Sequence, residues 1–146
     1  MITNFTLEEF LNSTTADDLG LNNYPTWDEV KCLERLAATM ERIRAGLGHK
    51  SVTILSGYRC YDVNQSVGGA ADSAHLYGLA CDFIVPDFGT PLEICKAIEP
   101  HMAMLEIDQL IHEFSDWVHL GLAEEGTIAR CQCLTIDNNG TFNGFK

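Results

Sequence analysis

The order of the hydrophobic patterns along the chain constrains its fold more than any other feature. Apolar side chains recur every three to four residues over positions 27–45, which predicts a helix with one buried face. Thr26 and Glu29 have the spacing of a capping box at the start of that helix. A second helix should begin at Pro91, behind a Thr90 cap. The other segments with strand-like patterns are 51–55, 79–85, 108–113, 117–122, 128–136 and 141–145.

Helices therefore come early in the chain and strands late. This order predicts an α+β fold, in which a small antiparallel sheet carries helices packed on it, rather than a series of βαβ units. Asn139-Gly140 is typical of a hairpin turn and favours an antiparallel pair at the end of the chain. No repeat, low-complexity tract or linker interrupts the 146 residues, so we expect one domain over residues 1–146.

The chain is strongly acidic. Its 9 basic and 21 acidic side chains give a formal charge of −12, with a pI near 4.6. A nucleic-acid partner would require a basic face that neutralises phosphates, so we expect no nucleic-acid partner. No segment approaches the roughly 20 apolar residues of a membrane span. The first residues lack the basic and apolar regions of a secretory signal, so we expect neither a membrane partner nor a signal peptide.

Six cysteines are scattered through the apolar patterns. An even number is compatible with disulfides in a secreted chain, but without a secretory signal a reducing compartment is the better expectation. Cys131 and Cys133 would share one face of a strand, either as half of a zinc site or as two small buried side chains. The second interpretation is favoured, because C-x-C alone lacks the further ligands that zinc needs.

Two segments carry histidines that packing alone does not explain. His75 lies in a loop before a strand in which Asp82 is the one charged residue among apolar neighbours, and His119 alternates through a later strand. A buried carboxylate is costly unless it is paired or bound to a cation. Together the three side chains would form the two-histidine, one-carboxylate set of a catalytic zinc site. In the alternative interpretation, His75 caps a turn, Asp82 pairs with an arginine and His119 is a core histidine.

A further motif, Ser56-Gly57-Tyr58-Arg59, follows the first predicted strand, and Asn64 and Gly68-Gly69 come shortly after it. The order Ser-Gly-Tyr-Arg, Asn, Gly-Gly, Ser-x-His-x-x-Gly-x-Ala-x-Asp, Trp-x-His resembles the zinc D-alanyl-D-alanine carboxypeptidase and L-alanoyl-D-glutamate endopeptidase family. The resemblance extends over residues 3–123, and its specific part is 56–82. The opening segment 5–10 and the helix before Ser56 are similar to the phage endolysin-like branch of that family.

This resemblance implies a fold like that of the Hedgehog domains and D-Ala-D-Ala peptidases. It implies one zinc ion (Zn2+) per chain, with His75, Asp82 and His119 as its ligands. The implied activity is cleavage of peptide bonds in peptidoglycan stem peptides or cross-links, of the carboxypeptidase or the endopeptidase type. The alternative is a catalytically inactive, zinc-containing binding or structural phage protein on the same scaffold, as the Hedgehog domains illustrate.

The resemblance also implies roles for residues around the metal. The general base of the family lies three residues before the last histidine, which is Asp116 here, and Glu113 is the alternative if the loop places it nearer the metal. Arg59 is implied as the residue that binds substrate and stabilises the developing oxyanion. Ser73, beside the first ligand, is implied as a substrate-binding or supporting hydrogen-bonding residue.

The resemblance further implies peptidoglycan peptides as the partners of a monomeric enzyme. With no signal peptide visible, the expected location is the host cytoplasm before release to the cell wall, or the virion itself. Because the protein is acidic, recognition should depend on local positive charge at the metal and Arg59.

Overall fold

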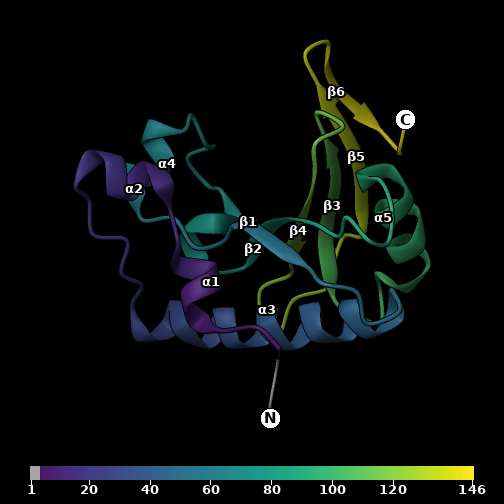
Figure 1. Ribbon diagram of the computed structural model, residues 1–146, viewed down its shortest axis with the longest axis horizontal. Helices are drawn as coiled ribbons and strands as arrows, with labels where there is room; N and C mark the ends of the chain where they lie inside the picture. The colour runs from purple at the N-terminus through teal and green to yellow at the C-terminus, as the bar shows by residue number, and fades with distance from the viewer. Residues whose placement is uncertain (1–3) are drawn as a thin grey trace.

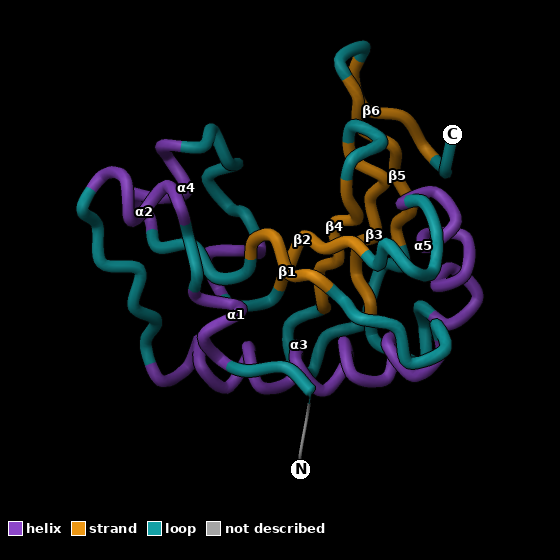
Figure 2. The backbone as a smooth tube through the Cα atoms, in the orientation of Figure 1, coloured by secondary structure: helices purple, strands orange, loops and turns teal. Residues whose placement is uncertain are grey.

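The structure is a computed structural model that describes residues 4–146, and one six-stranded sheet forms its centre (Figure 1). Figure 2 shows the strands gathered together, with helices around them. In order across the sheet, the strands are β1 (Thr53–Ser56), β2 (Ala80–Ile84), β4 (Trp117–Leu122), β3 (Ile107–Glu113), β5 (Gln132–Asp137) and β6 (Gly140–Asn143).

All neighbouring strands are antiparallel except β3 and β5, which are parallel. The expected α+β class is thus confirmed, but the sheet is mixed where we expected antiparallel pairing throughout. The reason lies in β4, whose two edges are already occupied by β2 and β3. When the chain reverses after β4, β5 pairs with the free edge of β3 instead. A strand that runs opposite to β4 necessarily runs parallel to β3.

The long predicted helix is α3 (Trp27–Gly46), and the capping box of Thr26 and Glu29 is present at its start. Its buried face includes Leu33, Leu36, Met40 and Ile43, while Ala37 is half-buried. The second predicted helix is α5 (Pro91–Ile98), which begins behind the Thr90 cap with proline in its first turn. No helix within residues 4–146 is long and apolar enough to cross a membrane.

The core lies between one face of the sheet and helices α3 and α5. Alternate strand residues such as Cys81, Phe83 and Leu120 belong to the same apolar cluster as the buried side chains of both helices. Because neighbouring strand residues point to opposite faces, Asp82 and His119 lie on the other face. The functional residues therefore lie on the face of the sheet that α3 and α5 leave uncovered.

Short elements complete the fold, and the sequence patterns did not predict them because each is too short to show a period. In Figure 1, α1, α2 and α4 lie together at one end of the molecule, away from α5. Their bounds are α1 Leu7–Leu11, α2 Thr14–Leu19 and α4 Tyr61–Ser66, and the two 3-10 helices are η1 Ala74–Tyr77 and η2 Glu99–His101.

All six cysteines are free thiols. Cys131 precedes β5 and Cys133 lies within it, and both pack half-buried against the core. The interpretation of this pair as apolar side chains agrees with these positions.

Candidate functional site

His75, Asp82 and His119 form one buried cluster, in which one ligand atom from each lies within 4.8 Å of the other two. Within residues 4–146, this is the one group of three or more histidine, cysteine or acidic side chains able to hold a metal ion. Asp82 on β2 lies directly opposite His119 on β4. Side chains of such cross-strand partners point to the same face and are close neighbours, so the sheet itself brings two of the three together.

His75 comes from η1, and its ring orientation is fixed by the backbone. Its Nδ1 donates a hydrogen bond to the carbonyl oxygen of Gly57 over 2.7 Å, while its Nε2 lies 3.4 Å from Oδ2 of Asp82. A proton held on Nδ1 leaves the Nε2 lone pair free for a metal, as in most metal-binding histidines. Ser73 caps η1 by accepting a bond from the His75 backbone N–H. The side chain of Ser73 thus supports the first ligand.

Glycines allow the close backbone contacts around this loop. A Cβ on Gly57 would lie 2.7 Å from Cα of Phe10, which is backbone and cannot swing away. Gly78 ends η1 in the left-handed region (φ +72°), where a Cβ would also lie 2.7 Å from the carbonyl oxygen of Glu29. Both positions therefore require glycine for steric reasons, and both adjoin the segment that carries His75.

The electrostatics of the cluster favour an ionised Asp82 and a neutral His75. Burial alone would raise the pKa of Asp82, but its contacts with His119 and His75 outweigh this effect, and the net shift is downward. Burial lowers the pKa of His75, although the neighbouring Asp82 carboxylate opposes this. An ionised carboxylate and a neutral imidazole are the protonation states in which these two residues bind a zinc ion.

Arg59 extends from the loop after β1 toward the cluster. Its guanidinium donates hydrogen bonds to Ser56 Oγ (3.2 Å), Asn64 Oδ1 (3.5 Å) and Asp82 Oδ2 (3.3 Å). Asn64 is itself held by a bond from its Nδ2 to the carbonyl oxygen of Ala70. Arg59 therefore lies beside the proposed ligands, held by three hydrogen-bond acceptors, and its role in binding substrate stays a prediction.

Of the two carboxylates proposed for proton transfer, the structure places Glu113 at the cluster. Glu113 Oε1 lies 3.9 Å from Nδ1 of His119, and its side chain is half-buried. Burial and the charge of Asp82 raise the pKa of Glu113. Asp116 is exposed in the turn between β3 and β4 and lies outside the lining of the cleft around the cluster.

The strand register explains this difference. Glu113 is the cross-strand partner of Trp117, which lies two residues before His119 on β4. Residues two apart in a strand share a face, so Glu113 is the diagonal neighbour of His119 on the face of the cluster. The indole N–H of Trp117 is buried and makes no hydrogen bond of good geometry. It nevertheless lies close enough to the Glu113 carboxylate to offset part of the rise in the pKa of Glu113.

These side chains line a single open cleft of about 1070 Å³. Its lining includes the glycine-containing segment 67–70 and residues 121–124, which comprise the end of β4 and the two residues after it. Phe114 and Trp117 also line it and form an aromatic pair, with ring centroids 5.5 Å apart. The cleft is large enough for an extended peptide, since small-ligand pockets are typically about 300–1,000 Å³.

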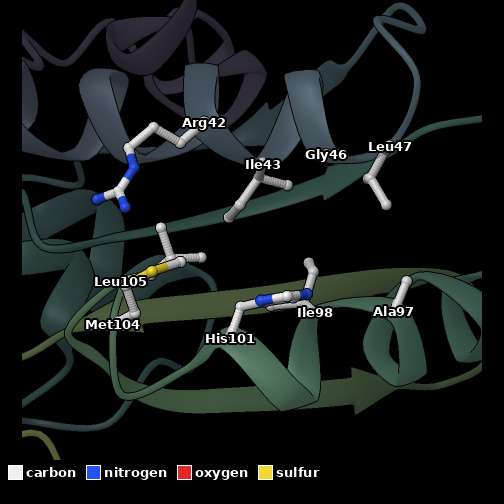
Figure 3. A pocket seen from close by; sticks show the side chains of 9 residues that line it. All are labelled: Arg42, Ile43, Gly46, Leu47, Ala97, Ile98, His101, Met104 and Leu105. Atoms are coloured by element: carbon white, nitrogen blue, oxygen red, sulfur yellow. The ribbon is translucent and has the colours of Figure 1, made fainter.

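A second pocket, of about 240 Å³, lies between the C-terminal half of α3 and the α5–η2 region (Figure 3). Its lining is mainly apolar, with Arg42 and His101 as the polar members. It shares no residue with the cleft, and none of its residues belongs to the candidate metal cluster.

Two histidines and a carboxylate in an open cleft, with an arginine and a second carboxylate beside them, define the class of this protein as a metal-dependent hydrolase. The sequence model of peptidase M15 matches residues 3–121. The chain belongs to this family of zinc peptidases, which confirms the resemblance found in the sequence. The donor set fits zinc, and His75, Asp82 and His119 are able to hold one ion.

A segment of the chain is also similar to the zinc D-Ala-D-Ala carboxypeptidase of Streptomyces albus G. The two are 40% identical over 43 residues, which are 30% of this chain. The match spans 17% of the length of that relative.

Proposed function

We propose that the protein is a zinc metallopeptidase that cleaves peptide bonds in peptidoglycan stem peptides or cross-links. The observation that carries the proposal is the buried cluster of His75, Asp82 and His119, which lies in an open cleft with Arg59 and Glu113 beside it. Membership of the M15 family supports the peptidase chemistry, and the activity for which the Streptomyces relative is named supports a peptidoglycan substrate.

His75, Asp82 and His119 are the proposed zinc ligands. When bound, zinc supplies a Lewis acid that acidifies a coordinated water and polarises the scissile carbonyl. The carbonyl oxygen of Gly57 holds His75 in the tautomer that such binding requires. Arg59 donates to Asp82 and thereby restricts the orientation of that carboxylate.

Glu113 is the proposed general base. The family resemblance implies Asp116 first for this role and Glu113 as the alternative. The side chain of Glu113 lines the cleft beside His119, whereas Asp116 is exposed to solvent and lies outside that lining. Glu113 would take a proton from the attacking water and give it to the leaving amine. A half-buried carboxylate whose pKa is raised by burial is well suited to hold that proton between the two steps.

Arg59 and Ser73 are the proposed substrate-binding residues, since both line the cleft. The guanidinium of Arg59 places fixed positive charge where the carbonyl oxygen becomes negative in the transition state. It is also a suitable partner for the free carboxylates of stem peptides. Since all these groups come from one chain, the proposed active unit is a monomer.

Digestion of purified murein tests this proposal. The zinc-loaded protein should release soluble peptides, and mass analysis of the fragments distinguishes the two proposed types. Loss of single terminal D-alanine residues identifies a carboxypeptidase, and internal cleavage of stem peptides or cross-links identifies an endopeptidase. A folded, zinc-loaded protein that released no peptide would instead support the catalytically inactive binding or structural protein.

We also propose that the enzyme is phage-derived and acts on the cell wall, either after release from the host cytoplasm or as a component of the virion. The support is the similarity of residues 5–10 and of the α3 segment to the phage endolysin-like branch. Expression timing and proteomic detection in purified particles would separate the released form from the virion-associated form.

A further inference from the structure

Asn23 lies buried in the loop between α2 and α3, and its side chain makes three hydrogen bonds to backbone groups. Its Nδ2 donates to the carbonyl oxygens of Leu11 and Tyr58, each over 2.9 Å. Its Oδ1 accepts from the backbone N–H of Cys60 over 2.8 Å. Two of the three bonds therefore go to the residues immediately before and after Arg59.

The segment that carries Arg59 has no strand or helix to hold it, because it lies between the end of β1 and the start of α4. Two further backbone bonds support it. The N–H of Tyr58 donates to the carbonyl of Phe10, and the N–H of Arg59 donates to the carbonyl of His75. The Asn23 side chain bridges the backbone on both sides of Arg59 and so adds two further supports.

We infer that Asn23 is a positioning residue for Arg59, fixing the backbone from which the guanidinium reaches the metal cluster. The inference rests on the proposed function of Arg59 in substrate binding. A side-chain amide of this length supplies both the donors and the acceptor that the site uses. The substitution Asn23→Asp keeps the size of the side chain, but an oxygen would then face the carbonyl oxygens of Leu11 and Tyr58.

Misplacing a substrate-binding group by about 1 Å can lower catalysis by roughly 100-fold without any contact to the substrate being removed. Asn23→Ala and Asn23→Asp are therefore expected to lower kcat/KM by about 10- to 100-fold on a stem peptide. Zinc content should stay at the wild-type level, because the side-chain bonds of Asn23 go to none of His75, Asp82 and His119.

The matched control is Thr39→Ala. Thr39 is also buried and polar, and its hydroxyl donates to the carbonyl of Arg35 within α3, away from the cleft. This variant should lose stability and keep wild-type kcat/KM. An equal loss of kcat/KM in the Thr39 and Asn23 variants would show a general effect of destabilisation and overturn the inference.

A double-mutant cycle with Arg59→Ala tests whether Asn23 acts through Arg59. In the Arg59→Ala background, Asn23→Ala should change kcat/KM by less than about twofold. An undiminished effect there, or loss of zinc from the Asn23 variants, would overturn the inference while leaving the proposed function intact. Wild-type kcat/KM in Arg59→Ala alone would instead refute the proposed role of Arg59.

If Arg59→Ala has too little activity for the double-mutant cycle, amide hydrogen exchange tests the inference instead. Asn23→Ala should speed exchange at the amides of Arg59 and Cys60 and leave those of β2 and β4 at the wild-type rate. Unchanged exchange at Arg59 and Cys60 would overturn the inference.

Discussion

Replacing Glu113 by glutamine separates the proton-transfer role of this carboxylate from its contribution to the fold. Glutamine has nearly the same shape, but it carries no negative charge and cannot accept and return a proton. Burial raises the pKa of Glu113, so a neutral group is well tolerated at this half-buried place. The free energy of unfolding should therefore change by less than about 1 kcal/mol.

The expected effect on the chemical step is much larger. A general acid–base residue contributes about 10²- to 10⁴-fold to the rate. At 1.36 kcal/mol per tenfold change, this is roughly 2.7–5.4 kcal/mol of activation free energy. The assay is kcat for release of peptide from a stem-peptide substrate by zinc-loaded protein, with zinc content measured in parallel.

Asp116→Asn is the matched control, because it removes the same charge three residues away, from an exposed position in the β3–β4 turn. Its kcat should stay within about twofold of wild type, as for most exposed substitutions away from a site. Wild-type kcat in Glu113→Gln, together with a loss of at least 100-fold in Asp116→Asn, would refute the reasoning from strand register and restore Asp116 as the base.

Three further predictions concern the loop, the metal and a surface ion pair. Gly57→Ala should destabilise the protein by about 2–4 kcal/mol in urea unfolding, since its Cβ would press on the Phe10 backbone and strain the hydrogen bond there. Asp82→Asn should bind zinc at least 10-fold more weakly in a competition titration with a chromogenic chelator, because the amide lacks the charge of the carboxylate. The bidentate bond from Arg130 lowers the pKa of Asp108, so Asp108→Asn should cost under about 1 kcal/mol at pH 7. That difference should disappear as the pH falls through the lowered pKa, because the stabilisation exists only while Asp108 is ionised. Wild-type stability of Gly57→Ala, wild-type zinc affinity of Asp82→Asn, or a stability difference for Asp108→Asn that persists at low pH would contradict the respective reasoning.

The sequence allowed the metal cluster to be predicted because its signals are local. Asp82 is conspicuous as a charged residue in an apolar strand, and the motif from Ser73 to Asp82 carries the first two proposed ligands on adjacent elements. His119 follows from the alternation of β4. The long helix α3 could be predicted equally well, because its capping box and its buried face both lie within one segment.

Features that depend on pairing between distant segments could not be predicted from the sequence in this way. The parallel pair of β3 and β5 follows from the occupied edges of β4, which only the assembled sheet defines. The placement of Glu113 depends on which residue lies across from Trp117. The family resemblance implies Asp116 instead, three residues before His119, but that residue lies in the exposed turn before β4.

Asn23 gave no signal at all in the sequence. It is 36 residues from Arg59, in an irregular loop, and its bonds are to backbone groups that no residue pattern reveals. Short helices such as α1 and α4 also could not be predicted from the sequence. They contain six residues or fewer, which is less than two turns and too short to show a helical period.

The central claim, that this cleft is a zinc peptidase site for peptidoglycan, is tested most directly by digesting purified murein with zinc-loaded wild-type protein and with zinc-treated Asp82→Asn. Mass spectrometry of the soluble fraction should show peptides released by cleavage of amide bonds with wild-type protein, and none above background with the variant. A folded wild-type protein with one zinc per chain that releases no peptide would contradict the claim, as would equal release by Asp82→Asn.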